Sequence, residues 1–125
     1  MTTRDRGEVS AQIVILTPVL ILLVFLGVQA AIYFHAANVA AAAAAQGAAA
    51  GSPLGAGAGA AETAARQTLA DLDGTGASPP VASESLDFVT VRVEVAVPQI
   101  VPFFPASVSR SATQPRERFV AESDR

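Results

Sequence analysis

The chain has 125 residues, of which 51% are hydrophobic and 15% charged, and its formal net charge is −3 at pH 7. This length fits one small domain, and the absence of cysteine excludes thiol catalysis, thiolate metal sites and disulfide frameworks. All 8 basic residues are arginine, so neither Schiff-base chemistry nor a lysine-rich nucleic-acid face is available.

A long stretch without formal charge lies between Glu8 and Glu62. Within it, residues 13–34 have the sequence IVILTPVLILLVFLGVQAAIYF, which as a helix would be about 33 Å long. The hydrocarbon core of a bilayer is about 30 Å thick, so this run predicts a membrane-spanning helix with the lipid bilayer as its partner. Pro18 has no backbone N–H and is expected to kink or soften the helix.

The arginines on either side of the apolar run predict its orientation. Arg4 and Arg6 precede the run, whereas the next basic residue is Arg66. Cytoplasmic flanks retain positive charge, so residues 1–8 are predicted to be a cytoplasmic leader, with the C-terminal region extracytoplasmic at the cell membrane. Two alternatives stay open: a buried helix of a soluble protein, and a secretory signal cleaved beyond Ala40.

An alanine-rich segment follows the apolar run, and residues 9–50 are predicted to form one long helix. Small side chains let helices approach closely, which suits lateral assembly, although a plain helical spacer explains the composition equally well. Residues 51–61 contain several glycines and predict a flexible joint.

Residues 62–113 are predicted to form a small module, which makes the fold class α+β. Residues 62–72 have the pattern of a short helix. Alternating valines over residues 86–97 predict a β-strand, and weaker alternation over residues 106–113 predicts its antiparallel partner. A hairpin alone is marginally stable, so its valine face should cover the short helix or a partner subunit. Residues 114–125 are predicted to be a flexible tail.

The connection between the two predicted strands is apolar and free of charge. Ile100, Val101, Phe103 and Phe104 are its candidate contacts with a partner. Alternatively, these side chains close the small core beneath the hairpin, and the residues alone leave both interpretations open.

Candidate sites of chemistry are few. His35 is the single histidine, and its position beside Tyr33 is typical of a membrane interface rather than of a catalytic base. Asp71 and Asp73 precede glycines as in a fragment of a calcium loop, but a solvated turn is favoured because too few oxygen ligands follow. We therefore expect no catalytic residue, metal, cofactor, nucleic-acid partner or small-molecule substrate.

Several features together resemble the TadE-like family. They are Arg6-Gly7 with a short spacer, an apolar helix with Pro18 in a TPVLILL run, an alanine-rich continuation, and a small outer region ending in a hairpin. The arrangement is similar to actinobacterial members in particular, and its specific motif lies in residues 5–23. Members are minor pilin or pseudopilin components of tight-adherence, Flp-type pilus systems. The resemblance implies a structural role in such a pilus or a related secretion system, with other pilus subunits and assembly-platform proteins as partners.

The same resemblance assigns positions near the N terminus. Gly7 would be the last residue before a prepilin-peptidase cut, Glu8 the new N terminus, and Gln12 the fifth mature residue. The family usually has glutamate at that fifth position, where its carboxylate compensates the amine of a neighbouring subunit, and the amide of Gln12 cannot neutralise a charge. Two other functions stay open: a membrane-tethered binding module outside any filament, and a secreted protein released by signal peptidase.

Overall fold

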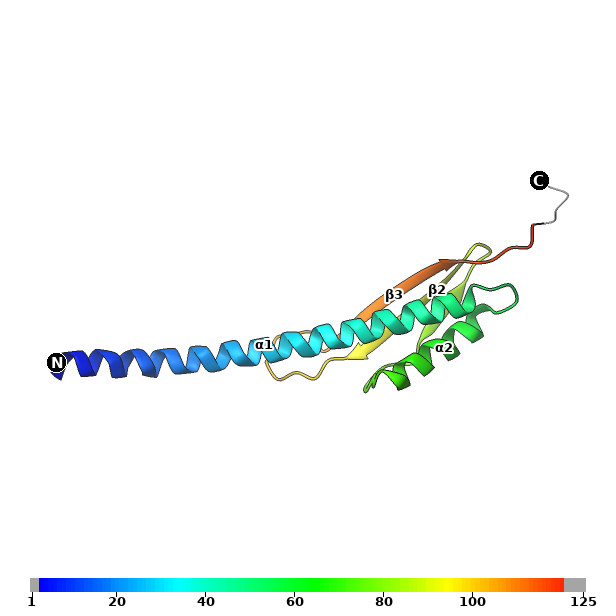
Figure 1. Ribbon diagram of the computed structural model, residues 1–125. Coiled ribbons are helices and arrows are strands. Elements are labelled where there is room, and N and C mark those ends of the chain that lie inside the picture. Colours follow the sequence, from blue (N-terminus) through cyan, green and yellow to red (C-terminus); the bar gives the residue numbers. More distant parts are fainter. Residues whose placement is uncertain (1–2, 121–125) are drawn as a thin grey trace.

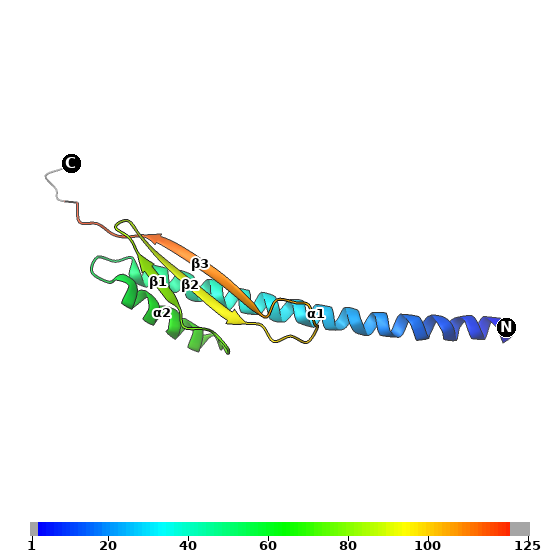
Figure 2. The same cartoon turned by 180° about the vertical axis from the view of Figure 1, so that it is seen from behind.

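A computed structural model describes residues 3–120 (Figure 1). The elements in chain order are α1 (Thr3–Gly51), α2 (Gly57–Asp71), β1 (Val81–Glu84), β2 (Phe88–Ala96) and β3 (Ser107–Pro115). The N-terminal half of α1 protrudes as a rod, and its C-terminal half packs with α2 and the sheet into a small module (Figures 1 and 2). The predicted α+β class is confirmed.

Helix α1 is continuous over 49 residues, which confirms the predicted extension of the apolar helix through the alanine-rich segment. Residues of the predicted leader, from Thr3 onward, belong to the same helix. Pro18 lies inside α1, and the helix is unbroken there (Figure 1). A proline removes one backbone hydrogen bond, and the turns on either side maintain the helix. A local softening at Pro18 stays a prediction.

The valine face of β2 forms one wall of the module's core. Val89, Val91 and Val93 are fully buried, and burying a side chain of this size contributes about 1.5–3 kcal/mol. The opposite wall consists of buried alanines from the two helices: Ala36, Ala37, Ala40, Ala43, Ala44, Ala48, Ala61 and Ala65. Helix α1 contacts β2 and β3, while α2 contacts β1 and β2. The predicted cover of the valine face by the short helix is therefore correct only in part, because α1 covers more of it.

The composition of the alanine-rich half of α1 suggests either lateral assembly or a plain spacer. The structure shows a third arrangement, because one face of this half lies in the core of its own module. Two glycines let α2 approach closely at this face. A Cβ atom added at Gly47 would lie 2.8 Å from the carbonyl oxygen of Ala61, and one added at Gly51 would lie 2.8 Å from the Ala61 Cβ. The folded unit therefore includes this half of α1 together with the predicted module.

Helix α2 begins at Gly57 rather than at residue 62, so the turn between the helices is shorter than the predicted joint. Two reciprocal hydrogen bonds connect this helix to β1. Glu84 Oε2 accepts from the backbone N–H of Ala58 at 2.9 Å, and Glu62 Oε1 accepts from that of Ala82 at 3.3 Å. A carboxylate at the first turn satisfies an otherwise unpaired helical N–H and favours an early helix start.

The sheet has three antiparallel strands in the order β1-β2-β3, one more than the predicted hairpin. Strand β1 pairs with β2 from Val81 opposite Arg92 to Glu84 opposite Val89. Its 4 residues are too few to display alternation, which is why the pattern of the sequence missed it.

The predicted tail begins as part of the fold. Strand β3 continues to Pro115, two residues beyond the predicted end. Arg116 then donates its backbone N–H to the carbonyl oxygen of Asp87 at 2.8 Å, and Glu117 donates its own to Ser52 at 2.9 Å. The prediction of a flexible tail from residue 114 is therefore wrong for its first residues, and residues 121–125 lie outside the described part of the chain.

Candidate functional site

The largest apolar surface of the described chain is the N-terminal half of α1. Its aliphatic and aromatic side chains are between 42% and 71% exposed, and they include Val9, Ile13, Val14, Ile15, Leu16, Val19, Leu20, Ile21, Leu22, Leu23, Val24, Phe25 and Val28. Seven of these residues, 19–25, are consecutive, so the surface extends around the whole circumference of the helix. The most hydrophobic window of α1 is 0% buried inside the protein. This surface excludes the interpretation as a buried core helix within the described fold.

The residues that the resemblance assigns to processing lie at the start of this exposed rod. Gly7, Glu8 and Gln12 are all exposed on α1. A Cβ atom added at Gly7 would meet nothing within 4 Å. A glycine inside a helix lowers its local stability by about 0.5–1 kcal/mol relative to alanine, so Gly7 marks a point where this end of α1 unwinds more easily. Processing at this position stays a prediction.

Gln29 connects the rod to the module. Its side chain is 0% exposed, although it lies in the apolar run that the sequence assigns to the membrane. Nε2 donates to the carbonyl oxygen of Pro98 at 3.1 Å, and Oε1 accepts from the backbone N–H groups of Ile100 at 2.7 Å and Val101 at 3.2 Å. One amide thus satisfies three backbone groups of the connection between β2 and β3.

This role of Gln29 was not predicted from the sequence. The available signal was a single amide within an apolar helix, since an isolated polar group in such a segment normally has a dedicated partner. The partner lies about 70 residues further along the chain, with sequence separations of 69 to 72 in the three hydrogen bonds. Only the folded arrangement identifies it.

The four candidate contact residues of the β2–β3 loop divide into two pairs. Val101 and Phe104 are half-buried, in agreement with a role in closing the module beneath the sheet. Ile100 is 47% exposed and Phe103 is 101% exposed, so these two side chains remain available for contact. Phe103 also has φ = 77°, in the left-handed region that side chains other than glycine rarely adopt.

The aromatic residues near the end of the predicted span lie just beyond Gln29. The rings of Tyr33 and Phe34 meet edge to face with centroids 5.9 Å apart. His35 is exposed next to them.

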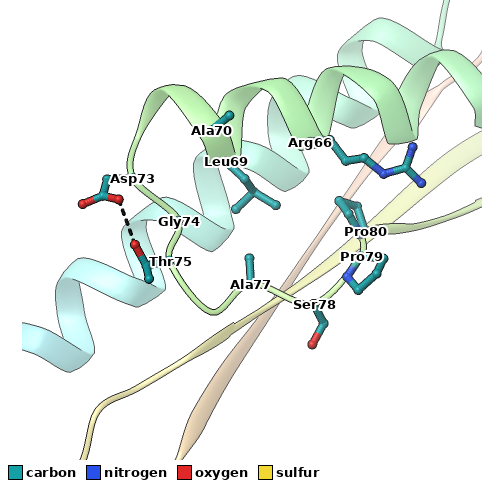
Figure 3. Close-up of a pocket in the computed structure, with 10 residues that line it drawn as sticks. All are labelled: Arg66, Leu69, Ala70, Asp73, Gly74, Thr75, Ala77, Ser78, Pro79 and Pro80. Carbon is teal, nitrogen blue, oxygen red and sulfur yellow. Dashed lines mark hydrogen bonds between the residues drawn. The ribbon is translucent and has the colours of Figure 1, made fainter.

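A surface pocket with a volume of about 430 Å³ lies between the end of α2 and the segment leading into β1 (Figure 3). Leu69 points toward its centre, while Arg66 and Asp73 lie at opposite ends. Arg66 faces Glu62 at 3.5 Å, and Asp73 Oδ1 accepts from the hydroxyl of Thr75 at 2.8 Å. The polar groups are therefore engaged with near neighbours in sequence rather than directed at a common point in the pocket.

The predicted solvated turn at Asp71 and Asp73 lies beside this pocket. Asp73 has φ = 54° and belongs to the turn that follows α2. Within residues 3–120, no three histidine, aspartate or glutamate side chains come together as ligands for a metal ion.

A helix whose one half is exposed and apolar, and whose other half is built into a small α+β module, fits a protein with a single-pass membrane anchor. Residues 7–49 match the model of the family described as TadE-like protein. This match confirms the resemblance predicted from the sequence, and it is confined to the N-terminal helix. Neither the curated proteins nor the solved structures contain a match to this chain.

Proposed function

We propose that this protein is a membrane-anchored minor pilin or pseudopilin of a Tad, Flp-type pilus or a related secretion system, with a structural rather than a catalytic role. The observation that carries the proposal is the division of α1 into an exposed apolar half and a half packed into the module. The family match covers this helix. Such a helix can anchor the subunit in the bilayer and later pack against the helices of other subunits.

The exposed half of α1 has the length that a bilayer requires. Residues 9–28 lie between Glu8, the last charged residue before the apolar run, and the buried amide of Gln29. As a helix they extend over about 30 Å, equal to the thickness of a hydrocarbon core. The structure therefore supports a span that begins and ends somewhat earlier than residues 13–34.

The distribution of arginine supports an N terminus in the cytoplasm. Arg4 and Arg6 lie before the span, and Arg66 is the first basic residue after it. Positive residues near the span favour the cytoplasmic side, and this supports a module that lies outside the cell membrane. The proposed partners are the bilayer, other pilus subunits, assembly-platform proteins and a prepilin peptidase.

The buried face of α1 argues against a secreted protein released by signal peptidase. A cut beyond Ala40 would remove Ala36, Ala37 and Val39, which are at most 5% exposed in the core. The same cut would remove Gln29 and its three hydrogen bonds to the β2–β3 loop. The released chain would lack part of the wall against which the valines of β2 pack.

The test exchanges residues 9–28 for a polyleucine span of equal length in the full chain, in the protein's own host. We expect the exchanged protein to remain in the membrane but to fail to restore pilus assembly in a strain that lacks the gene, whereas the wild-type chain restores it. A tethered binding module would need only an anchor. Full restoration by the polyleucine chain would therefore refute the pilin-type role, and loss of the protein from the membrane fraction would refute the anchor.

A further prediction concerns the N terminus of the protein isolated from membranes of the same host. Processing by a prepilin peptidase would give a chain that starts at Glu8, and intact-mass analysis with N-terminal sequencing would detect it. The matched variant is Gly7→Leu, which should leave the N terminus uncut because a bulky side chain replaces the glycine at the cut. A wild-type chain that starts at Met1 or Thr2 would show that the helix is an unprocessed anchor.

A further inference from the structure

We propose that the β2–β3 loop is a second membrane contact, in which Phe103 and Ile100 enter the lipid interface beside the end of the membrane span. The inference rests on the membrane anchoring proposed above and adds to it a surface of the module itself. Figures 1 and 2 show that this loop is the part of the module that reaches furthest toward the N-terminal half of α1.

The hydrogen bonds of Gln29 fix the height of the loop along the helix. They hold the backbone of Pro98, Ile100 and Val101 at the level of residue 29. With Glu8 at the inner boundary, the next 20 residues cross about 30 Å of hydrocarbon and end at this level. The loop is therefore at the outer boundary of the hydrocarbon core.

The boundary suits the loop better than any deeper position. Irregular backbone exposed to hydrocarbon would leave its polar groups without partners, whereas the headgroup region supplies water. If residues 13–34 crossed the hydrocarbon core, the loop would lie inside it. If residues 9–28 cross the hydrocarbon core, the loop lies at its boundary. Tyr33 and Phe34 then lie about one to two helical turns further out, in the zone where aromatic side chains are enriched.

The chemistry of the loop fits lipid rather than a charged protein surface. From Val95 to Ser109 the chain has no charged residue. Phe103 is 101% exposed and Ile100 is 47% exposed, and the backbone N–H of Ile100 bonds to Gln29 at the end of the span. Because Gln29 holds the loop at the end of the span, the lipid that surrounds the span reaches these two exposed apolar side chains.

The backbone of Phe103 gives an independent reason to expect a function there. A φ of 77° is unfavourable for phenylalanine, and the fully exposed side chain provides no packing inside the fold that would compensate. Residues held in sparsely populated backbone conformations cluster at sites that contact ligands or switch conformation. Contact with lipid explains why an aromatic residue rather than glycine lies at this position.

The experiment uses the absence of tryptophan from the chain. Phe103→Trp, Phe25→Trp and Phe88→Trp are made separately in the full-length protein, which is reconstituted into phosphatidylcholine vesicles with brominated acyl chains. Phe25 lies on the span and is 47% exposed. Phe88 is 51% exposed and is the first residue of β2, at the opposite end of this strand from the loop. The three variants thus make the same substitution at the span, at the loop and at a distant site on the module.

We expect lipid bromine to quench tryptophan fluorescence at positions 103 and 25 but not at position 88. At position 103, bromine near the headgroup should quench more strongly than bromine deep in the acyl chain. Quenching at 25 with none at 103 would overturn the loop contact while leaving the anchor intact. A blue-shifted, unquenched emission at 103 would likewise overturn it, in favour of a protein contact. Absence of quenching at 25 would overturn the anchor and the loop contact together.

A second variant separates lipid contact from folding. In Phe103→Gly the left-handed backbone is no longer strained, so the module should unfold at the same or a higher temperature than the wild type. We expect the Ile100→Trp, Phe103→Gly double variant to show weaker quenching by bromine than Ile100→Trp alone. Equal quenching in the two would show that Phe103 does not hold the loop against the bilayer.

Discussion

Replacing Gln29 with leucine is expected to lower the stability of the module by about 2–4 kcal/mol, because three backbone groups lose their partner. The Pro98 carbonyl and the N–H groups of Ile100 and Val101 all bond to this one side chain. A leucine of similar size fills the space but neither donates nor accepts. Thermal unfolding of the full chain in detergent, followed by circular dichroism, measures the loss.

Gln46→Leu is the matched control for this substitution. Gln46 is on the same helix, in the half that packs into the module, and its side chain is exposed to solvent. The same chemical change there should alter stability by no more than about 0.5 kcal/mol. Hydrogen exchange adds a local measurement, since the amides of Ile100 and Val101 should lose protection in Gln29→Leu alone. Equal protection in both variants would contradict the anchoring role of Gln29.

The sequence predicts the two helices and the two longer strands because each has a local pattern, strong for α1 and β2 and weaker for α2 and β3. The apolar run and the alanine-rich segment favour one continuous helix, and the alternating valines identify β2. Contacts between residues that are distant in the sequence leave no such local pattern. Glu84 accepts a hydrogen bond from Ala58 at a separation of 26 residues, and this bond supports a helix start at Gly57 that the glycines argue against.

The alanine-rich half of α1 shows why composition alone did not define its role. Small side chains are needed both for free helices that pack between subunits and for a helix that lies close to a sheet. The choice depends on the valines of β2, which bury this face within the same chain. The candidate site can likewise be predicted only in part. The local sequence identifies the exposed span, whereas the position of the β2–β3 loop along the helix depends on the long-range hydrogen bonds of Gln29.

Replacing Gly47 with valine is expected to have an effect of similar size, at the contact between α1 and α2. A Cβ atom there would lie 2.8 Å from the Ala61 carbonyl oxygen, 3.0 Å from the Ala65 Cβ and 3.2 Å from a methyl group of Val91. Valine adds two further methyl groups, so the helix or the sheet must move apart. Overpacking of this kind costs about 1–3 kcal/mol and sometimes more.

Gly27→Val makes the same change on the same helix, where an added Cβ would meet nothing within 4 Å. Valine is a slightly better helix former than glycine, so backbone propensity cannot account for a loss of stability at either position. Thermal unfolding in detergent should therefore show a marked decrease for Gly47→Val and little change for Gly27→Val. If Gly47→Val unfolds like the wild type, α2 does not pack against α1 at this distance. The part of the alanine-rich face that lies toward α2 would then be free for neighbouring subunits, and lateral assembly through that part would again explain its composition.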